Sequence, residues 1–144
     1  MSRLLVFLQF LFILLIGYPS FLPNISYLSI LSIGLFLSGI VIFFIALITM
    51  RRHTFTVFPE PKAGGRLITS GIYGYVRHPM YLAVTLCALG ASLFFGLWWK
   101  WILTGLLLFL FWLKICREEK MLLTCYSQYA LYKRTTKAII PFIL

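Results

Sequence analysis

Two short stretches of the chain carry side chains that could do chemistry. The first, residues 73–81, reads YGYVRHPMY, so three tyrosines, an arginine and a histidine surround a proline suited to the first turn of a helix. A helix that begins at Pro79 offers unpaired backbone N–H groups and the positive end of its dipole, which suit a carboxylate or a phosphate. The second stretch, Arg117-Glu118-Glu119, places two adjacent carboxylates where they could hold a cation. An anion site beside a carboxylate would suit a zwitterionic ligand.

Each stretch also has a plainer interpretation. Arginine and tyrosine are common where a protein meets the head groups of a membrane, so the first stretch could be an interfacial anchor. The glutamate pair could be a solvated helix face, or Glu118 could pair with Arg77. The two histidines and three cysteines of the chain show no metal-ligand spacing and no CxxC pair. We therefore expect no metal site and no disulfide framework.

The composition indicates a membrane protein. Of the 144 residues, 62% are hydrophobic and only 11% are charged. A soluble domain of this size cannot enclose so much apolar surface, so we expect one integral membrane domain over residues 1–144. The formal charge of +10 then reflects basic residues beside apolar spans and anionic lipid. Nucleic-acid binding is not expected, because no groove-reading motif is present.

Four apolar runs predict four transmembrane helices. Pro19 and Pro23 separate the first two runs, and small residues over 32–39 predict close packing of the second helix. No small-x-small cleavage site follows the first run, so we expect it to be an uncleaved span. Residues 96–101, with three tryptophans, predict a tight interfacial turn that makes the last two spans a hairpin. The expected spans are about 4–22, 26–50, 79–96 and 101–115.

The chain after the fourth span predicts an extramembrane helix. No breaker follows residue 115, so the helix should continue into water, with Lys114 reaching the head groups. Tyr126, Tyr129 and Tyr132 recur every three residues, which predicts an amphipathic helix lying back on the domain. The expected fold is an all-α integral membrane protein with about four transmembrane helices and a cytoplasmic C-terminal amphipathic helix.

The distribution of charge predicts the orientation. Twelve of the thirteen basic residues lie at the N-terminus, between spans two and three, or from Lys114 onward, and only Lys100 lies on the opposite side. The positive-inside rule makes the basic side cytoplasmic, so both termini are expected there. All three glutamates also fall on that side. A hairpin of the last two spans would therefore bring residues 73–81 and 117–119 together on the cytoplasmic face.

Three blocks of the sequence have a recognisable order and spacing. Residues 67–73 lead into Arg77-His78-Pro79-Met80-Tyr81, and residues 118–122 are followed by Tyr129, Tyr132 and Pro141. Thr56-Val57 and Pro59 lie upstream. Together these blocks resemble the isoprenylcysteine carboxyl methyltransferase family, whose signature is shared in part with phospholipid methyltransferases. The resemblance covers roughly residues 51–141. Ile72, Gly74 and Cys125-Tyr126 depart from the family pattern.

The resemblance implies a membrane-embedded methyltransferase that uses S-adenosyl-L-methionine, with cofactor-binding elements at 65–81 and 117–141. Leu67 and Ile68 would line the cofactor with apolar and backbone contacts, and Tyr73 would add a further contact. The main wall would be formed by four residues around the helix start: His78, Pro79, Met80 and Tyr81. Glu118 would hold the cationic part of the cofactor.

The acceptor would be lipophilic and would enter from the bilayer. A carboxylate acceptor of the isoprenylcysteine type needs a positive partner, for which Arg117 is the first candidate and Arg134 the second. A lipid amine acceptor would instead need a general base, for which Glu119 is the candidate. The alternative function is a noncatalytic small membrane subunit whose arginines and tyrosines are interfacial anchors.

Overall fold

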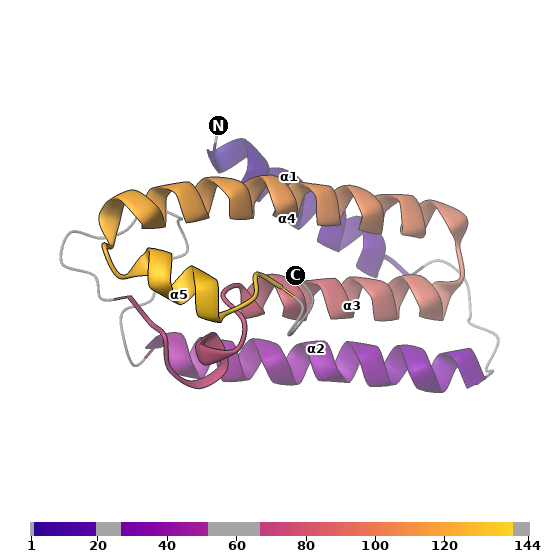
Figure 1. Cartoon of the computed structure of the whole chain (residues 1–144). Helices are drawn as coiled ribbons and strands as arrows, with labels where there is room; N and C mark the ends of the chain where they lie inside the picture. The colour runs from indigo at the N-terminus through magenta and orange to yellow at the C-terminus, as the bar shows by residue number, and fades with distance from the viewer. Residues whose placement is uncertain (1, 20–26, 52–66, 140–144) are drawn as a thin grey trace.

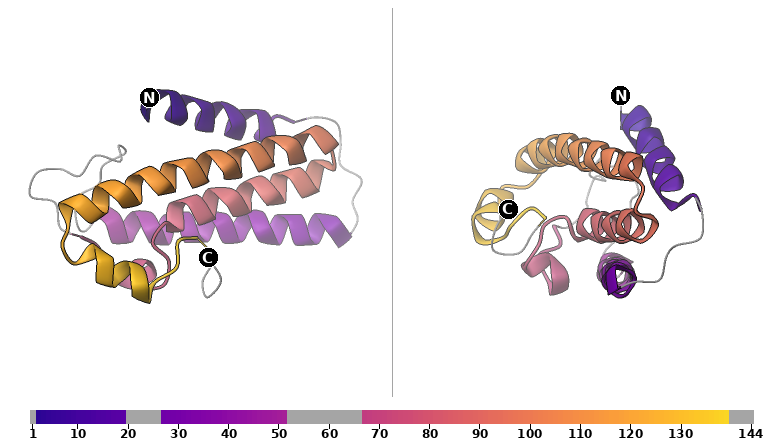
Figure 2. Two further views of the ribbon diagram at one scale, coloured as in Figure 1. Left: turned by 45° about the horizontal axis from the view of Figure 1, so that its top comes forward. Right: turned by 90° about the vertical axis from the view of Figure 1, so that its right-hand side faces the viewer.

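The computed structural model describes residues 2–19, 27–51 and 67–139, and within these ranges the chain is helical (Figure 1). The helices are α1 (Ser2–Gly17), α2 (Tyr27–Arg51), the 3₁₀ helix η1 (Gly71–Gly74), α3 (Pro79–Phe95), α4 (Trp98–Cys125) and α5 (Tyr129–Thr135). A single parallel bridge joins Val76 to Lys137 in the described ranges. Helices α2, α3 and α4 lie side by side in one layer, with α1 against one flank and α5 and η1 on the other (Figure 2).

Among the described residues, two helices are long and apolar enough to cross a membrane. They are the segment Ser29–Met50 of α2, with 22 residues, and the whole of α4, with 28 residues. The apolar helices α1 and α3 are shorter. Large apolar side chains are exposed on the outer faces of α1, α2 and α4, including Phe7, Ile30 and Phe109. Exposed apolar surface of this extent is suited to lipid rather than to water.

Glycines set the close contact between α2 and α3. A Cβ added at Gly39 would lie 2.6 Å from the backbone oxygen of Ala83, and one added at Gly90 would lie 2.7 Å from the backbone oxygen of Ser32. No side chain fits between these backbones, so the small residues at both positions are what let the helices approach. The close packing predicted for residues 32–39 is confirmed at Ser32 and Gly39, whereas Gly34 faces open space.

The turn between α3 and α4 is shorter than the sequence predicted. Gly96 ends α3 in the left-handed region, with φ of 64°, and α4 already begins at Trp98. The expectation that residues 96–101 form a turn is therefore wrong for Trp98–Trp101, which make the first turn of α4. Lys100 is fully buried there and donates hydrogen bonds to the carbonyl oxygens of Ile16 and Tyr18, at 2.8 and 2.7 Å. It satisfies carbonyl groups left unpaired at the end of α1.

The core joins α1, α3 and α4. Its buried members are Ile16, Ala88, Leu107, Leu110 and Phe111. Helix α4 is longer than α3, which has 17 residues, so it extends past the start of α3. Helix α5 folds back beneath this extension, beside η1 (Figure 1). We call this region, where α3 begins and α4 ends, the charged end of the bundle.

Candidate functional site

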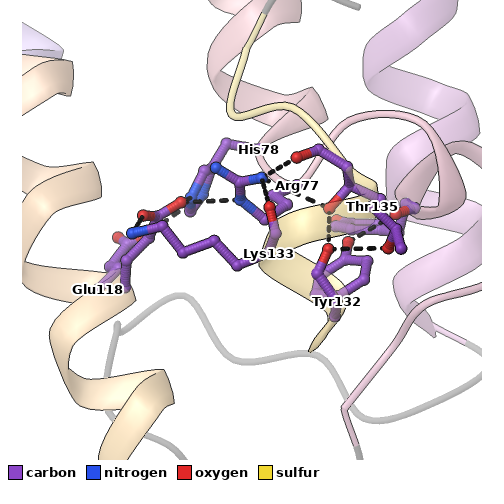
Figure 3. Close-up of polar contacts among 9 residues, drawn as sticks. Arg77, His78, Glu118, Tyr132, Lys133 and Thr135 are labelled. Carbon is purple, nitrogen blue, oxygen red and sulfur yellow. Dashed lines mark hydrogen bonds and ion pairs between the residues drawn. The ribbon is translucent and has the colours of Figure 1, made fainter. Parts of the chain in front are cut away.

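An ion pair connects the two stretches that the sequence singled out. Arg77, directly before α3, donates from Nε to Oε1 of Glu119 on α4 at 2.8 Å. Both side chains are buried, with 8% and 9% of their surface exposed. Lys133 of α5 approaches the other carboxylate oxygen at 2.6 Å (Figure 3). The charged end therefore holds three chain segments together through one carboxylate.

Backbone hydrogen bonds attach the tail to the same place. The N–H groups of Arg77 and His78 donate to the carbonyl oxygens of Lys137 and Ala138, at 2.8 and 3.0 Å. The guanidinium of Arg77 also donates to the carbonyl oxygens of Lys133, at 3.1 Å, and of Thr136. These bonds fix residues 136–138 alongside residues 75–78, as a parallel bridge rather than as a helix.

Tyr132 makes a second attachment, on the opposite side of the tail. Its hydroxyl donates to the carbonyl oxygen of Tyr73 in η1 at 2.5 Å. Its own carbonyl accepts from the hydroxyl of Thr136 at 2.6 Å, which closes the end of α5. The short helix α5, with seven residues, is thus held by its partners on both sides. Its stability comes from docking, because an isolated helix this short does not form in water.

Glu118 has a different environment from its neighbour. Its Oε1 accepts a hydrogen bond from the Tyr81 hydroxyl at 2.5 Å, and its Oε2 lies 3.6 Å from Nδ1 of His78. Tyr81 is stacked between His78, with ring centroids 5.6 Å apart, and Phe111, at 4.8 Å. The Glu118 side chain is 18% exposed, twice the fraction of Glu119. Within the glutamate pair, Glu118 is therefore the carboxylate with capacity for a further partner.

The electrostatics of Glu119 follow from its partners. Helix α4 is about 42 Å long, longer than a hydrocarbon core of about 30 Å, so a membrane crossing by α4 would leave its charged last turns outside the core. Burial alone raises the pKa of the Glu119 carboxyl. Hydrogen bonds from Lys133 and Arg77, with Nε2 of His78 at 3.6 Å from Oε1, outweigh it and lower the pKa to about 2. Glu119 is therefore ionised at neutral pH and is a weak base.

Buried polar atoms at the charged end lack hydrogen-bond partners among the described residues. They are Nε2 of His78 and the hydroxyl of Tyr129, whose side chain is 1% exposed. In the first turn of α3, Pro79 has no N–H and Tyr81 donates its N–H to the carbonyl oxygen of His78, and the N–H of Met80 has no backbone acceptor among the described residues. Groups of this kind are available to a polar ligand.

The remaining candidate residues lie around this cluster. Tyr73 is buried in η1, with its hydroxyl 3.8 Å from the sulfur of Met50 on α2. Leu67 and Ile68 are half-buried in the segment before η1, and Met80 is half-buried at the start of α3. Arg117 is half-buried on α4. It precedes Glu119 by two positions, so the two side chains leave the helix about 200° apart.

The sequence left open a pairing of Glu118 with Arg77, and the structure does not have it. Glu119, and not Glu118, pairs with Arg77. Adjacent positions of a helix point about 100° apart, so the angular position of α4 against α3 decides which glutamate turns inward, and no residue pattern encodes that angle. Sequence reasoning also missed Lys133 and Thr136 as partners of this cluster. The only signal was the three-residue spacing of tyrosines that placed α5 against the domain.

Comparisons with known proteins agree with the resemblance seen in the sequence. A family model described as phospholipid methyltransferase matches residues 27–129. The Protein-S-isoprenylcysteine O-methyltransferase of Schizosaccharomyces pombe is 35% identical over 79 residues, which are 54% of this chain and 34% of that protein. The solved structure of a eukaryotic intramembrane Ras methyltransferase, an isoprenylcysteine carboxyl methyltransferase, superposes with a TM-score of 0.72 at 24% identity.

The structural match covers 98% of this chain and 52% of the solved one. The chain therefore spans about half the length of the solved structure and about a third of the curated relative. At this level of identity the superposition establishes the fold. The family model reaches from the start of α2 to the start of α5 and covers most of the chain. The chain thus belongs to the phospholipid methyltransferase family, and it is similar to isoprenylcysteine carboxyl methyltransferases in sequence and in fold.

Proposed function

We propose that this protein is a membrane-embedded methyltransferase that takes its methyl group from S-adenosyl-L-methionine and transfers it to a lipophilic acceptor. Membership of the phospholipid methyltransferase family supports the reaction class. The observation that carries the proposal is the charged end itself. There, a partly exposed carboxylate, Glu118, lies beside buried polar atoms that have no partner among the described residues.

The residues of the charged end fit the proposed cofactor. The methionine part of S-adenosyl-L-methionine has an ammonium, a carboxylate and a sulfonium. Glu118 would hold the cationic groups, and the N–H of Met80 together with Nε2 of His78 would serve the carboxylate. The segment 67–73 and Tyr81 would supply apolar and aromatic walls. Tyr129 would add its hydroxyl, which has no partner among the described residues and to which the sequence assigned no role.

The proposed topology has four membrane crossings, by α1, α2, α3 and α4. The N-terminus, the segment between α2 and α3, and the tail then share one side of the membrane. Twelve of thirteen basic residues lie on that side, which supports a cytoplasmic placement. The charged end would face the cytosol, from which a soluble cofactor can reach it. Helix α5 would lie outside the bilayer as the C-terminal amphipathic segment.

The enzyme's contribution in this mechanism is positioning and exclusion of water. When bound, the cofactor supplies an electrophilic methyl group on a sulfonium. The fixed contacts of Arg77 with Glu119 and residues 136–138 would hold the walls of the site, so Glu119 becomes a positioning residue. Its pKa of about 2 disfavours the base role considered from the sequence. Arg117 is the candidate that the sequence offered for countering negative charge on an acceptor.

A transfer assay tests the proposal. The purified protein, in detergent with a total lipid extract, is incubated with S-adenosyl-L-methionine carrying a labelled methyl group, and the labelled lipids are separated. We expect label in a lipid fraction with the wild type and a loss of most of it with Glu118→Gln. The exposed Lys120→Gln change on the same helix is the control. Absence of both transfer and cofactor binding would favour the noncatalytic membrane subunit instead.

A further inference from the structure

Lys114 is a charged residue in the apolar part of α4. Rather than extending along the helix towards head groups, as the sequence suggested, it donates from Nζ to Oε1 of Gln9 on α1 at 2.6 Å. The same ammonium lies 5.2 Å from the centre of the Tyr81 ring. The Lys114 side chain is half-buried, as is Gln9. It therefore turns inward, to the junction of α1, α3 and α4.

Lys114 makes no direct ion pair in the part of the chain that the structure describes, although the charge of Glu118 acts on it from one helical turn away. Its hydrogen-bond acceptor there is the neutral amide of Gln9, and none of the described carboxylates lies within ion-pair distance of Nζ. An ammonium held within an apolar bundle is costly, and such residues mark sites that handle ligands. The other buried lysine, Lys100, differs, because two backbone carbonyls of the end of α1 accept its hydrogen bonds.

The position of Lys114 relates it to the proposed cofactor site. It precedes Glu118 by four residues, which is about one helical turn, so both side chains lie on the same face of α4. Tyr81 contacts both, with its ring near Lys114 and its hydroxyl on Glu118. Phe10, beside Gln9 in the chain, has 59% of its surface exposed. A lipophile lying along this part of α1 would have its head beside Gln9 and Lys114.

We propose that Lys114, positioned by Gln9, binds the carboxylate head of the lipophilic acceptor, and that α1 thereby forms part of the acceptor site. This inference rests on the proposed methyltransferase function and narrows its substrate to an anionic lipophile. A carboxylate oxygen forms the new bond to the methyl carbon as the carbon–sulfur bond breaks, and the electron pair of that bond goes to sulfur. No proton moves, so Lys114 stays charged throughout. An ammonium head would be repelled at the same place.

Binding of three single-chain probes tests this inference without turnover. Hexadecanoate, hexadecanol and hexadecylamine share a chain and differ in the charge of the head. Their binding to the detergent-purified full chain is measured by equilibrium dialysis. Hexadecanoate should bind best, and Lys114→Met should weaken it about tenfold or more through loss of a charge-assisted hydrogen bond. Hexadecanol binding should be unchanged, and Lys114→Arg should restore most of the hexadecanoate affinity.

Two further variants and one competitor make the result decisive. Lys120→Met also removes one lysine charge from α4 but at an exposed position, and it should leave all three affinities unchanged. Gln9→Leu should weaken hexadecanoate binding less than Lys114→Met does. Equal hexadecanoate affinities in the wild type and Lys114→Met would overturn the inference. Displacement of hexadecanoate by much lower concentrations of phosphatidylglycerol would also overturn it, since Lys114 would then be a site for bilayer head groups.

The failure of this inference is separable from failure of the proposed function. Affinity for S-adenosylhomocysteine, the demethylated cofactor, is measured on the same samples. If the cofactor product binds equally well to the wild type and Lys114→Met while selectivity for the carboxylate is absent, the acceptor inference alone is wrong. If the product does not bind at all, the proposed function fails, whatever the probes show.

Discussion

The substitution Glu119→Gln should separate the roles of the two adjacent glutamates. It removes the negative charge that faces Arg77 at 2.8 Å and Lys133 at 2.6 Å, while keeping the shape of the side chain. Lys133 is 42% exposed and can turn to water, but Arg77 is 8% exposed and stays charged. Removing one partner of a buried pair costs about 3–5 kcal/mol. The carbonyl acceptors that Arg77 keeps at Lys133 and Thr136 place the expected loss near the lower figure.

Two assays measure this effect. A loss of about 3 kcal/mol should lower the melting temperature of the detergent-solubilised protein by about 10 °C. Trypsin should also cleave more rapidly after Lys133, Arg134 or Lys137, because the tail is released from residues 75–78. The matched change is Glu118→Gln, which leaves the Arg77 pair intact and should shift the melting temperature much less. Equal destabilisation by the two substitutions, or unchanged cleavage of the tail in Glu119→Gln, would refute this account of the pair.

Three other predictions concern stability. Acidification should destabilise the protein, because the pKa of Glu119 is about 2 in the folded state against 4.5 for an ordinary glutamate. The ionised Glu119 then contributes about 3 kcal/mol of stability, which is complete above pH 4.5 and is lost as pH falls through 2. Melting curves over this pH range would show the loss. Gly39→Ala should impair folding yield, since its Cβ would lie 2.6 Å from the Ala83 oxygen, whereas Gly34→Ala, with open space, should not. Tyr132→Phe removes the donor to Tyr73 and should cost about 1–2 kcal/mol and speed tryptic cleavage of the tail, and unchanged cleavage would argue against that attachment.

Much of the fold could be predicted because apolar runs and breakers are local signals. Helix α2 (Tyr27–Arg51) and helix α3 (Pro79–Phe95) lie within a residue or two of the predicted spans. Prolines and uncharged stretches mark such boundaries directly. The start of α4 was misplaced because tryptophans suit an interface whether or not they are helical. One left-handed glycine, Gly96, was sufficient to reverse the chain direction.

The site was harder to predict from sequence. The predicted hairpin correctly brings residues 73–81 next to Glu118 and Glu119, since hairpin geometry follows from a short turn. The identity of the inward glutamate depends on the rotation of α4, and the docking of residues 136–138 uses backbone groups that every residue has. The contact of Lys114 with Gln9 joins residues 105 positions apart, on helices whose relative depth no motif records. Side-chain types could therefore be proposed, but their partners could not.

Titration of the purified protein with S-adenosylhomocysteine examines the proposed cofactor site without any assumption about the acceptor. We expect saturable binding to the wild type and at least tenfold weaker binding to Glu118→Ala, with a melting temperature close to that of the wild type. Lys120→Ala, at an exposed position on the same helix, should bind as the wild type does. Absence of binding to the wild type, or equal affinity in Glu118→Ala, would contradict a cofactor site built on Glu118 at the charged end.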